Sequence, residues 1–386
     1  MKNNRLFAGI LSVLLMVLVV ALFIITGQLK IYEEKSCTEL TSFHNSGVEI
    51  QLPDVYYVAS GMDAAIYNRQ ISNLGTHIEE YEVEWVTEYE GVSATSDRFE
   101  ISTVAGTEYE SPVTVSIFDQ ERTLLARKEF TLKVVDAKQW QFSVLAIGDS
   151  LSANGALYAR LQELLGNQMI CNGTRGYEGF LTEARLGFSA KDYLTETGYY
   201  LEEGEKVHKF WNPEKGRFDW NYYKTTTGFH PEVVLLHLGT NGLLSGEENA
   251  ENICKIVELI RQDDENLPIY VVNTIYQSDQ NGIGSMKLNN GSLMFPGQYK
   301  QERDLANFKL RAYLTDHLKN MEKVYLVPAS VSVDAANVFL TEEKPVNPYS
   351  TEMVAVATDA VHPAPEGYRQ IADVIYHTLC GTVEEW

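Results

Sequence analysis

The stretch Ser143-Val-Leu-Ala-Ile-Gly-Asp-Ser-Leu-Ser-Ala153 decides the fold that we predict for the second half of the chain. Its apolar run predicts a buried strand, and apolar residues at helical spacing follow from Ala156 to Leu165. A strand, a tight turn and a helix place the turn at the carboxyl end of a parallel strand, where open α/β sheets bind ligands. We therefore expect Ser150 at a helix N-terminus, as a nucleophile whose own N–H helps to hold an oxyanion. The alternative is an ordinary turn with a serine cap.

Length and composition indicate a folded protein with two domains and additional segments. The chain has 386 residues, of which 45% are hydrophobic, and its net charge is −22 at pH 7. Such a negative charge disfavours nucleic acid as a partner. The cysteines are far apart and form no zinc-binding pattern, so we expect free thiols at Cys37, Cys171, Cys254 and Cys380. No phosphate-cradling loop or dinucleotide fingerprint occurs, and we expect no cofactor.

The N-terminal segment predicts a membrane anchor. Lys2 and Arg5 precede an uncharged apolar run over residues 6–26, which is long enough to cross a hydrocarbon core of ~30 Å. No small-x-small cleavage site follows, so residues 1–27 predict an uncleaved signal anchor, with cleavage as the alternative. Positive charge at the N-terminal side places that end in the cytoplasm. The chain is then a single-pass protein of the cell membrane, with residues 28–46 as a tether and its later domains extracytoplasmic.

Residues 47–138 predict an all-β module. Hydrophobic and polar residues alternate over 81–86, 113–118 and 130–134, with turn signals between these runs. About seven short strands predict a β-sandwich, and Trp85 looks like a core residue of an immunoglobulin-like domain, although no cysteine pair accompanies it. The module contains no cluster of catalytic residue types. It is either an accessory module that binds glycan or protein, or a spacer or cover for the next domain.

Residues 139–386 predict an α/β domain. After the first strand and helix, further strands are expected at 168–171, 233–238, 268–275 and finally 324–327. Helical patterns separate or follow them, including one from about Asp304 to Lys319. Strands that alternate with helices predict a mostly parallel sheet with helices on both faces.

Polar residues stand where the predicted strands end or helices begin: Gly148-Asp-Ser150, Gly239-Thr-Asn241 and Asp359-Ala-Val-His-Pro363. In this order, over about residues 141–380, they resemble the conserved blocks of the SGNH/GDSL hydrolases, a superfamily of serine esterases and acyl transferases. The resemblance implies a flavodoxin-like three-layer α/β/α sandwich. It also implies that Ser150 is the nucleophile and Asn241 an oxyanion donor. Asp359 and His362 are then the acid and base of the triad.

The resemblance implies a glycine N–H as a further oxyanion donor. The stretch Glu183-Ala-Arg-Leu-Gly-Phe-Ser189 resembles the Glu-x-Arg-x-Gly-Trp-Thr version of carbohydrate-esterase-like branches, which assigns this donor to Gly187. Gly176 and Gly179 are rivals, because the stretch that contains them has a similar glycine-rich pattern.

The chemistry of acyl transfer requires these residue types. Serine needs a base, and histidine titrates near neutral pH without large perturbation. The histidine needs a carboxylate that fixes its tautomer and stabilises its charged form. The tetrahedral intermediate needs donors that point at the developing negative charge.

Other polar and aromatic residues receive structural interpretations. We expect Asp149 to fix the turn before the nucleophile, His237 to be a packed core histidine, and Glu183 and Arg185 to form an ion pair beside the oxyanion loop. Aromatic residues of the insert at 199–223 either pack a small lid core or stack on sugar rings.

The sequence therefore predicts a membrane-anchored serine esterase that acts on short acyl esters. The favoured substrate is an acetyl ester on a saccharide at or outside the cell surface. One alternative is an O-acetyltransferase that modifies envelope polysaccharide with the same triad. A second alternative is a catalytically silent surface protein that binds glycan.

Overall fold

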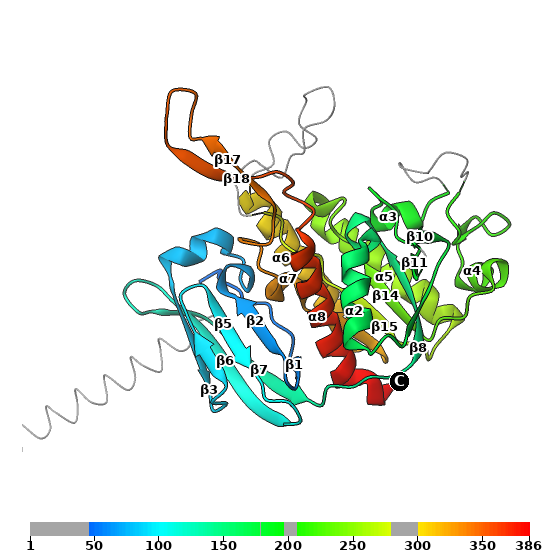
Figure 1. Ribbon diagram of the computed structural model, residues 1–386, viewed down its shortest axis with the longest axis horizontal. Helices are drawn as coiled ribbons and strands as arrows, with labels where there is room; N and C mark the ends of the chain where they lie inside the picture. The colour runs from blue at the N-terminus through cyan, green and yellow to red at the C-terminus, as the bar shows by residue number, and fades with distance from the viewer. Residues whose placement is uncertain (1–45, 178, 197–206, 279–299) are drawn as a thin grey trace, which may run out of the picture.

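The computed structural model describes residues 46–386, except 178, 197–206 and 279–299 (Figure 1). Across these described ranges, no helix combines the length and the apolar character that are needed to cross a membrane. The predicted anchor at residues 1–27 and nearly all of the tether lie outside the described residues. Both therefore stay predictions.

A five-stranded sheet forms the centre of the second half of the chain, with strand order β16-β15-β14-β8-β9. All of its neighbouring strands pair in parallel. In order of sequence this is the 2-1-3-4-5 arrangement of flavodoxin-like folds. The predicted α/β class with a mostly parallel sheet is confirmed. The strands are Phe142–Gly148 (β8), Met169–Asn172 (β9), Val233–His237 (β14), Ile269–Val272 (β15) and Val324–Val327 (β16).

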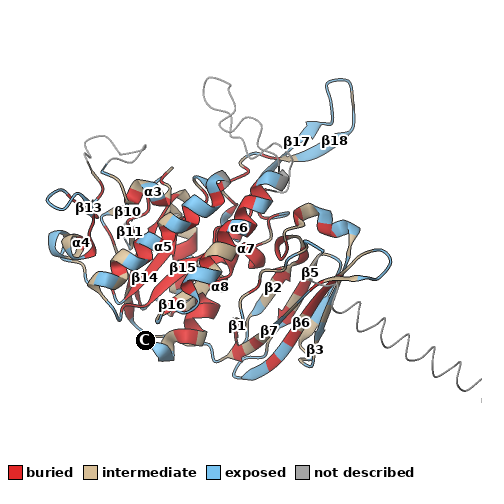
Figure 2. Ribbon diagram, turned by 180° about the vertical axis from the view of Figure 1, so that it is seen from behind, coloured by how far each residue is buried: buried red, intermediate tan, exposed pale blue. Residues whose placement is uncertain are grey.

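Successive residues of the central strands pack into two different cores, one on each face of the sheet. Val144 and Ala146 contribute to the core that includes α2 and α8, whereas Leu145 and Ile147 contribute to the core that includes α5 and α6. Figure 2 shows the buried strands between these helices. Because both faces are covered, the strands are apolar throughout rather than alternating. The helices are Gly155–Leu164 (α2), Gly246–Asp263 (α5), Lys300–Leu318 (α6) and Pro365–Thr382 (α8). Helix α6 begins before the predicted residue 304, because its polar first turn carries no apolar signal.

The β module before this domain consists of two sheets, with orders β1-β7-β6-β3 and β2-β5-β4. Trp85 faces inward: its ring stacks on Phe99 at 4.6 Å, and its Nε1–H donates to Asn68 Oδ1. An immunoglobulin-like relationship stays a prediction. The strands are Val55–Ala59 (β1), Asp63–Tyr67 (β2), Glu82–Thr87 (β3), Val92–Ala94 (β4), Arg98–Ser102 (β5), Tyr109–Phe118 (β6) and Leu124–Val135 (β7).

The β module packs against α8, which lies between this module and the central sheet (Figure 1). The N–H of Ala59 donates to His377 Nδ1 at 3.1 Å, and Tyr56 and Ser332 share a hydroxyl hydrogen bond of 2.8 Å. Because both sides of α8 are covered, buried residues occupy most of its circumference. These contacts agree with a cover for the α/β domain, and binding of glycan or protein by the module stays a prediction.

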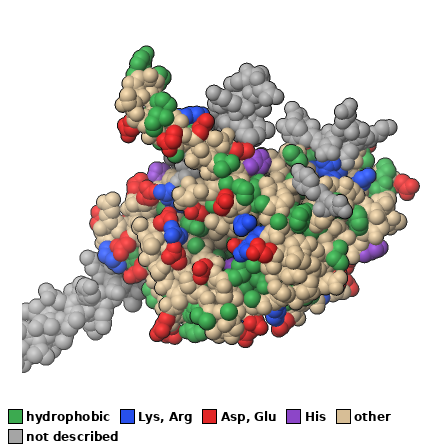
Figure 3. Space-filling model, viewed as in Figure 1, with side chains coloured by type: hydrophobic (Ala, Val, Ile, Leu, Met, Phe, Trp, Pro, Cys, Tyr) green, Lys and Arg blue, Asp and Glu red, His purple; other side chains and the backbone are tan. Residues whose placement is uncertain are grey.

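A two-stranded antiparallel hairpin, β17 (Thr341–Pro345) and β18 (Met353–Ala357), projects from the body of the protein (Figure 1). The sequence did not predict this hairpin, because the last strand expected from the apolar pattern is at residues 324–327. All of β17 and most of β18 are solvent-exposed, so no alternating pattern marks them. Figure 3 shows acidic and apolar side chains on this hairpin. Its second strand leads directly into the loop that contains Asp359 and His362.

The contact between α8 and β1 predicts a specific cost for enlarging Gly381. A Cβ atom at this position would lie 2.1 Å from the Tyr57 ring. We expect Gly381→Ala to lower the free energy of unfolding by about 1–3 kcal/mol in denaturant titration, because the ring and the helix must separate. The control is Gly155→Ala at the start of α2, where an added Cβ meets open space. Equal stability of both variants would contradict the described packing.

Candidate active site

A close approach of two strands positions Ser150. Strand β8 ends at Gly148, where a Cβ atom would lie 2.6 Å from the carbonyl oxygen of His237 on β14, so only glycine fits. Asp149 then caps the short 3-10 helix at Ser150–Ala153, because its Oδ1 accepts the Leu151 N–H at 2.9 Å. The expected role of Asp149 in fixing this turn is confirmed. Ser150 is left half-buried at the carboxyl end of the sheet.

Ser150, His362 and Asp359 form one hydrogen-bonded row. The Oγ of Ser150 lies 2.8 Å from Nε2 of His362, and Nδ1 of His362 lies 2.8 Å from Oδ2 of Asp359. The other carboxylate oxygen of Asp359 accepts the backbone N–H groups of Val361 and His362. Because an ionised carboxylate has no proton to donate, Nδ1 is the donor and Nε2 is free to accept the Ser150 hydroxyl proton. The structure thus brings together the three predicted triad residues.

The electrostatics of the row favour a charged imidazole. The hydrogen bond to Asp359 raises the pKa of His362, while burial opposes this shift. Burial works against ionisation of Asp359, but hydrogen bonds from His362 and from two backbone N–H groups outweigh it and lower the pKa of the carboxyl. Such a pair is suited to a histidine that takes up a proton during a reaction.

Asn241 lies in a loop that α5 holds in place. Asn249 of α5 donates its Nδ2 hydrogens to the carbonyl oxygens of Gly239 and Asn241, at 3.0 and 3.1 Å. The hydroxyls of Thr240 and Thr274 are also hydrogen-bonded to each other. The loop follows β14, whereas Ser150 follows the neighbouring strand β8, so both lie at the switch point of the sheet.

Gly187 lies in a turn that hydrogen bonds connect to both Gly148 and Asn241. The N–H of Arg185 donates to the carbonyl oxygen of Gly148 at 2.9 Å, and the Phe188 N–H closes the turn onto the Arg185 carbonyl. Gly187 is the third residue of this turn and has a φ of 76°, a conformation that favours glycine. The side chain of Asn241 donates to the Phe188 carbonyl at 3.0 Å. These bonds place the loop of Gly187 beside both Gly148 and Asn241.

The two rival glycines lie in or beside the hairpin of β10 (Arg175–Tyr177) and β11 (Phe180–Thr182). Gly176 lines the same cavity as Ser150, and a Cβ there would lie 2.5 Å from the Phe180 carbonyl oxygen, so the hairpin itself requires glycine. Gly179 is in the turn, where an added Cβ meets open space. The bonds to Gly148 and Asn241 support Gly187, and the choice among the three stays a prediction.

Ser150 and His362 open into a cavity of about 850 Å³. Its charged wall residues, apart from His362, are Arg175 and Lys209, and no carboxylate belongs to the wall that the described residues form. The few apolar wall residues include Ala153 and Leu186. Two cationic side chains, Arg175 and Lys209, therefore lie on the wall of the active-site cavity of a chain whose net charge is −22.

Several structural interpretations of the sequence are confirmed. His237 is 3% exposed, and burial lowers its pKa to about 4, as expected for a packed neutral histidine. Phe210 and Tyr223 of the insert are fully buried and stack at 4.4 Å, which favours the lid core over a sugar-stacking surface. Glu183 is buried and accepts hydrogen bonds from the Thr174 N–H and the Tyr223 hydroxyl, and its expected ion pair with Arg185 stays a prediction. The three described cysteines, Cys171, Cys254 and Cys380, are free thiols, and Cys37 lies outside the described residues.

Asn249 is a site residue that the sequence pattern did not predict. It occupies an amphipathic helix, where a single asparagine usually indicates a polar surface, yet it is 4% exposed and bridges two loop carbonyls. A polar residue at a buried position of the helical pattern was the only available signal.

Comparison with known proteins identifies the family. The sequence profile of the family described as GDSL-like lipase/acylhydrolase matches residues 144–375, which is more than half of the chain. The chain therefore belongs to this family, as the SGNH/GDSL resemblance implied, and it is an ester-cleaving hydrolase. No curated protein sequence matches the chain.

Solved structures with some similarity include a member of the lipolytic G-D-S-L family from Veillonella parvula DSM 2008, with 14% identity and a TM-score of 0.34, covering 60% of this chain and 94% of that one. An acetyl esterase mutant with an acetate ion has 15% identity and a TM-score of 0.35, covering 63% and 99%. A peptidoglycan O-acetylesterase has 13% identity and a TM-score of 0.33, covering 65% and 93%. Similarities this low carry no argument about function.

Asn249 provides a test of the loop that positions Asn241. In Asn249→Ala two loop carbonyls lose their donor, so Asn241 is held less firmly, and we expect kcat for p-nitrophenyl acetate to fall by about 10–100-fold. The matched control is Asn252→Ala, one turn further along α5 and only partly buried. We expect wild-type kcat for this control. If both variants lose activity equally, or neither does, Asn249 does not position the loop.

Proposed function

We propose that this protein is a serine esterase in which Ser150 attacks the carbonyl carbon of an acyl ester. The observation that carries the proposal is the hydrogen-bonded row of Ser150, His362 and Asp359, with 2.8 Å between Ser150 Oγ and His362 Nε2 and 2.8 Å between His362 Nδ1 and Asp359 Oδ2. In this family setting, such a row is the arrangement of nucleophile, base and orienting acid that acyl transfer requires.

Each step of the reaction uses these side chains. His362 takes the proton from the Ser150 hydroxyl as the C–O bond forms, and the resulting imidazolium is stabilised by Asp359. The backbone N–H groups of Ser150 and Gly187 and the side-chain amide of Asn241 donate to the oxyanion. His362 next protonates the leaving alcohol. It then removes a proton from water, whose oxygen attacks the acyl carbon, and returns that proton to Ser150 Oγ as the bond between Ser150 and the acyl group breaks.

The acyl group in this proposal is short, with acetyl favoured. The cavity beside Ser150 has few apolar wall residues, such as Ala153, Ala184 and Leu186, so it offers little apolar surface to a fatty acyl chain. The alcohol part is a saccharide at or outside the cell surface. This part of the proposal is supported by the resemblance of residues 183–189 to a carbohydrate-esterase motif and by the predicted anchor at residues 6–26.

Two alternatives use the same fold. An O-acetyltransferase would employ the same row of residues, with a sugar hydroxyl in place of water. A catalytically silent glycan-binding protein would have no use for the hydrogen bonds between Ser150, His362 and Asp359, and their presence counts against it.

The primary test is release of acetate from p-nitrophenyl acetate and from acetylated oligosaccharides. We expect Ser150→Ala and His362→Ala to lower kcat by about 10⁴-fold or more, and Asn241→Ala to lower it by about 10²–10³-fold. Ser93→Ala, on β4 of the β module, serves as a remote control and should be unaffected. Transfer of the acetyl group to an added saccharide in preference to water would identify a transferase. Full hydrolysis by folded Ser150→Ala would exclude the proposed nucleophile.

The cationic lining of the active-site cavity suggests a preference among saccharides. Arg175 and Lys209 lie on the wall of the cavity into which Ser150 opens, where a negative charge on the substrate would be attracted. An exposed anionic ligand elsewhere on this acidic protein would be repelled. We infer that the preferred ester carries a carboxylate, as in a saccharide that contains an acidic sugar.

This preference is tested with acetylated neutral and acidic oligosaccharides. We expect the double variant Arg175→Gln, Lys209→Gln to raise KM for the acidic substrate by about tenfold at low salt, with little change in KM for the neutral one. High salt should reduce the difference in wild-type protein. An equal change in KM for both substrates would show that the two side chains do not select for charge.

A further inference from the structure

A buried phenol connects the segment before Ser150 to the segment before Gly187. Tyr193 is the last residue of the short helix α3 (Ala190–Tyr193) and is 0% exposed. Its hydroxyl lies 2.7 Å from the carbonyl oxygen of Gly148 and 2.7 Å from that of Glu183. Gly148 ends β8 two residues before Ser150, and Glu183 stands four residues before Gly187. One hydroxyl therefore joins the segments that carry the proposed nucleophile and a proposed oxyanion donor.

The phenol of Tyr193 is the donor in both contacts, because carbonyl oxygens only accept hydrogen bonds. A single O–H hydrogen shared between two acceptors forms a three-centre bond. Burial raises the pKa of Tyr193 well above its usual value, so the phenol keeps its proton at neutral pH. The bond to both carbonyl oxygens is thus present throughout the pH range in which His362 could act as a base.

Two backbone hydrogen bonds join the same segments. The Glu183 N–H donates to the Ala146 carbonyl oxygen at 2.8 Å, and the Arg185 N–H donates to the Gly148 carbonyl oxygen at 2.9 Å. The Gly148 oxygen therefore accepts from both Arg185 and Tyr193, which its two lone pairs allow. Residues 183–185 are fixed along the end of β8 by donors from their own backbone and from α3.

The turn at residues 185–188 also orients Asn241. The Phe188 carbonyl oxygen accepts one hydrogen of the Asn241 side-chain amide at 3.0 Å. The amide nitrogen carries a second hydrogen, which is the one available to an oxyanion. The ring of Phe188 packs edge-on against the ring of Tyr193 at 5.2 Å. The position of this turn therefore sets the direction of two proposed donors, the Gly187 N–H and the Asn241 amide.

We propose that Tyr193 is a positioning residue for the oxyanion donors, an inference that rests on the proposed esterase function. Its hydroxyl holds the turn at residues 185–188 at a fixed distance from the end of β8, so that the donors are in place before the negative charge develops. Tyr193 is no part of the wall that the described residues form around Ser150. It therefore acts on the donors rather than on the substrate.

Tyr193→Phe in the full-length chain tests the proposal, because phenylalanine keeps the ring and removes the hydroxyl. We expect kcat for p-nitrophenyl acetate to fall by about tenfold, since misplaced donors stabilise the transition state less. We expect KM to change by less than about twofold, because the substrate carbonyl gains little from these donors before the reaction. The pH at which kcat/KM falls on the acid side should stay at the wild-type value, since His362 keeps its partners.

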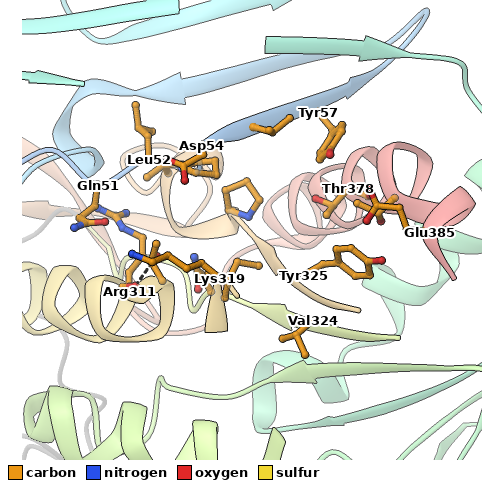
Figure 4. Close-up of a pocket in the computed structure, with 18 residues that line it drawn as sticks. Gln51, Leu52, Asp54, Tyr57, Arg311, Lys319, Val324, Tyr325, Thr378 and Glu385 are labelled. Carbon is orange, nitrogen blue, oxygen red and sulfur yellow. Dashed lines mark hydrogen bonds between the residues drawn. The ribbon is translucent and has the colours of Figure 1, made fainter. Parts of the chain in front are cut away.

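The matched control is Tyr270→Phe, which removes a buried phenolic hydroxyl elsewhere. Tyr270 is 0% exposed, and its hydroxyl is hydrogen-bonded to Thr382 Oγ1 at 2.6 Å and to Trp386 Nε1 at 2.8 Å. Thr382 lines a separate cavity of about 220 Å³ between the β module and the α/β domain (Figure 4). The wall of that cavity shares no residue with the wall around Ser150. We expect both variants to lower Tm by about 2–4 °C, but Tyr270→Phe should keep the wild-type kcat and KM.

A merely structural role for Tyr193 gives a different result. Wild-type kcat in folded Tyr193→Phe, measured well below its Tm, would overturn the proposal, as would an equal loss of kcat in Tyr193→Phe and Tyr270→Phe. A shifted acid limb of the pH profile would also overturn it, because the base rather than the donors would then be displaced. Ser150→Ala separates the two levels: if it is inactive while Tyr193→Phe keeps wild-type kcat, the esterase stands and only this inference fails.

A second variant serves if Tyr193→Phe does not fold. The N–H and the hydroxyl of Ser189 both donate to Asp192 Oδ2 at 2.7 Å, and these bonds close the start of α3. Asp192→Ala removes them at a partly exposed position and loosens the helix that carries Tyr193. We expect kcat to fall by about threefold with little change in KM. Wild-type kcat in this variant would overturn the proposal.

Discussion

The structure depends on the close approach of β8 and β14 at their carboxyl ends. Gly148 leaves no room for a side chain beside the His237 carbonyl oxygen, and the Asp149 N–H donates to that same oxygen at 3.3 Å. The loops that contain Ser150 and Asn241 follow these two strands, so this contact sets the distance between the proposed nucleophile and one proposed oxyanion donor. The turn that contains Gly187 is held at the same place, because the Arg185 N–H donates to the Gly148 carbonyl oxygen.

His362 lies beside Ser150 in the structure although it follows Ser150 by 212 residues in the chain. It precedes α8, whose position is set on one side by the central sheet and on the other by the β module. The hydrogen bond between Ala59 and His377 and the close contact of Tyr57 with Gly381 both fix α8. The β module thus contributes to the placement of the base, although it supplies no residue to the row itself.

The apolar patterns of the strands and helices were sufficient to predict the parallel sheet, and the resemblance to the SGNH/GDSL family implied the row of Ser150, His362 and Asp359. Three features could not be predicted. Asn249 lies in a helix where its burial depends on tertiary packing, and the exposed strands β17 and β18 lack a periodic signal. The pairing of α8 with β1 depends on contacts between residues more than 300 positions apart, such as Ala59 and His377.

The most direct measurement of the central claim is labelling of the purified protein with a fluorophosphonate, followed by mass mapping of the modified peptide. The reagent reacts with a serine that a neighbouring base activates. The account predicts stoichiometric modification of Ser150, slowed by at least about 10³-fold in His362→Ala and in Asp359→Asn. Modification of a different residue, or an unchanged rate in the folded His362→Ala variant, would contradict the account.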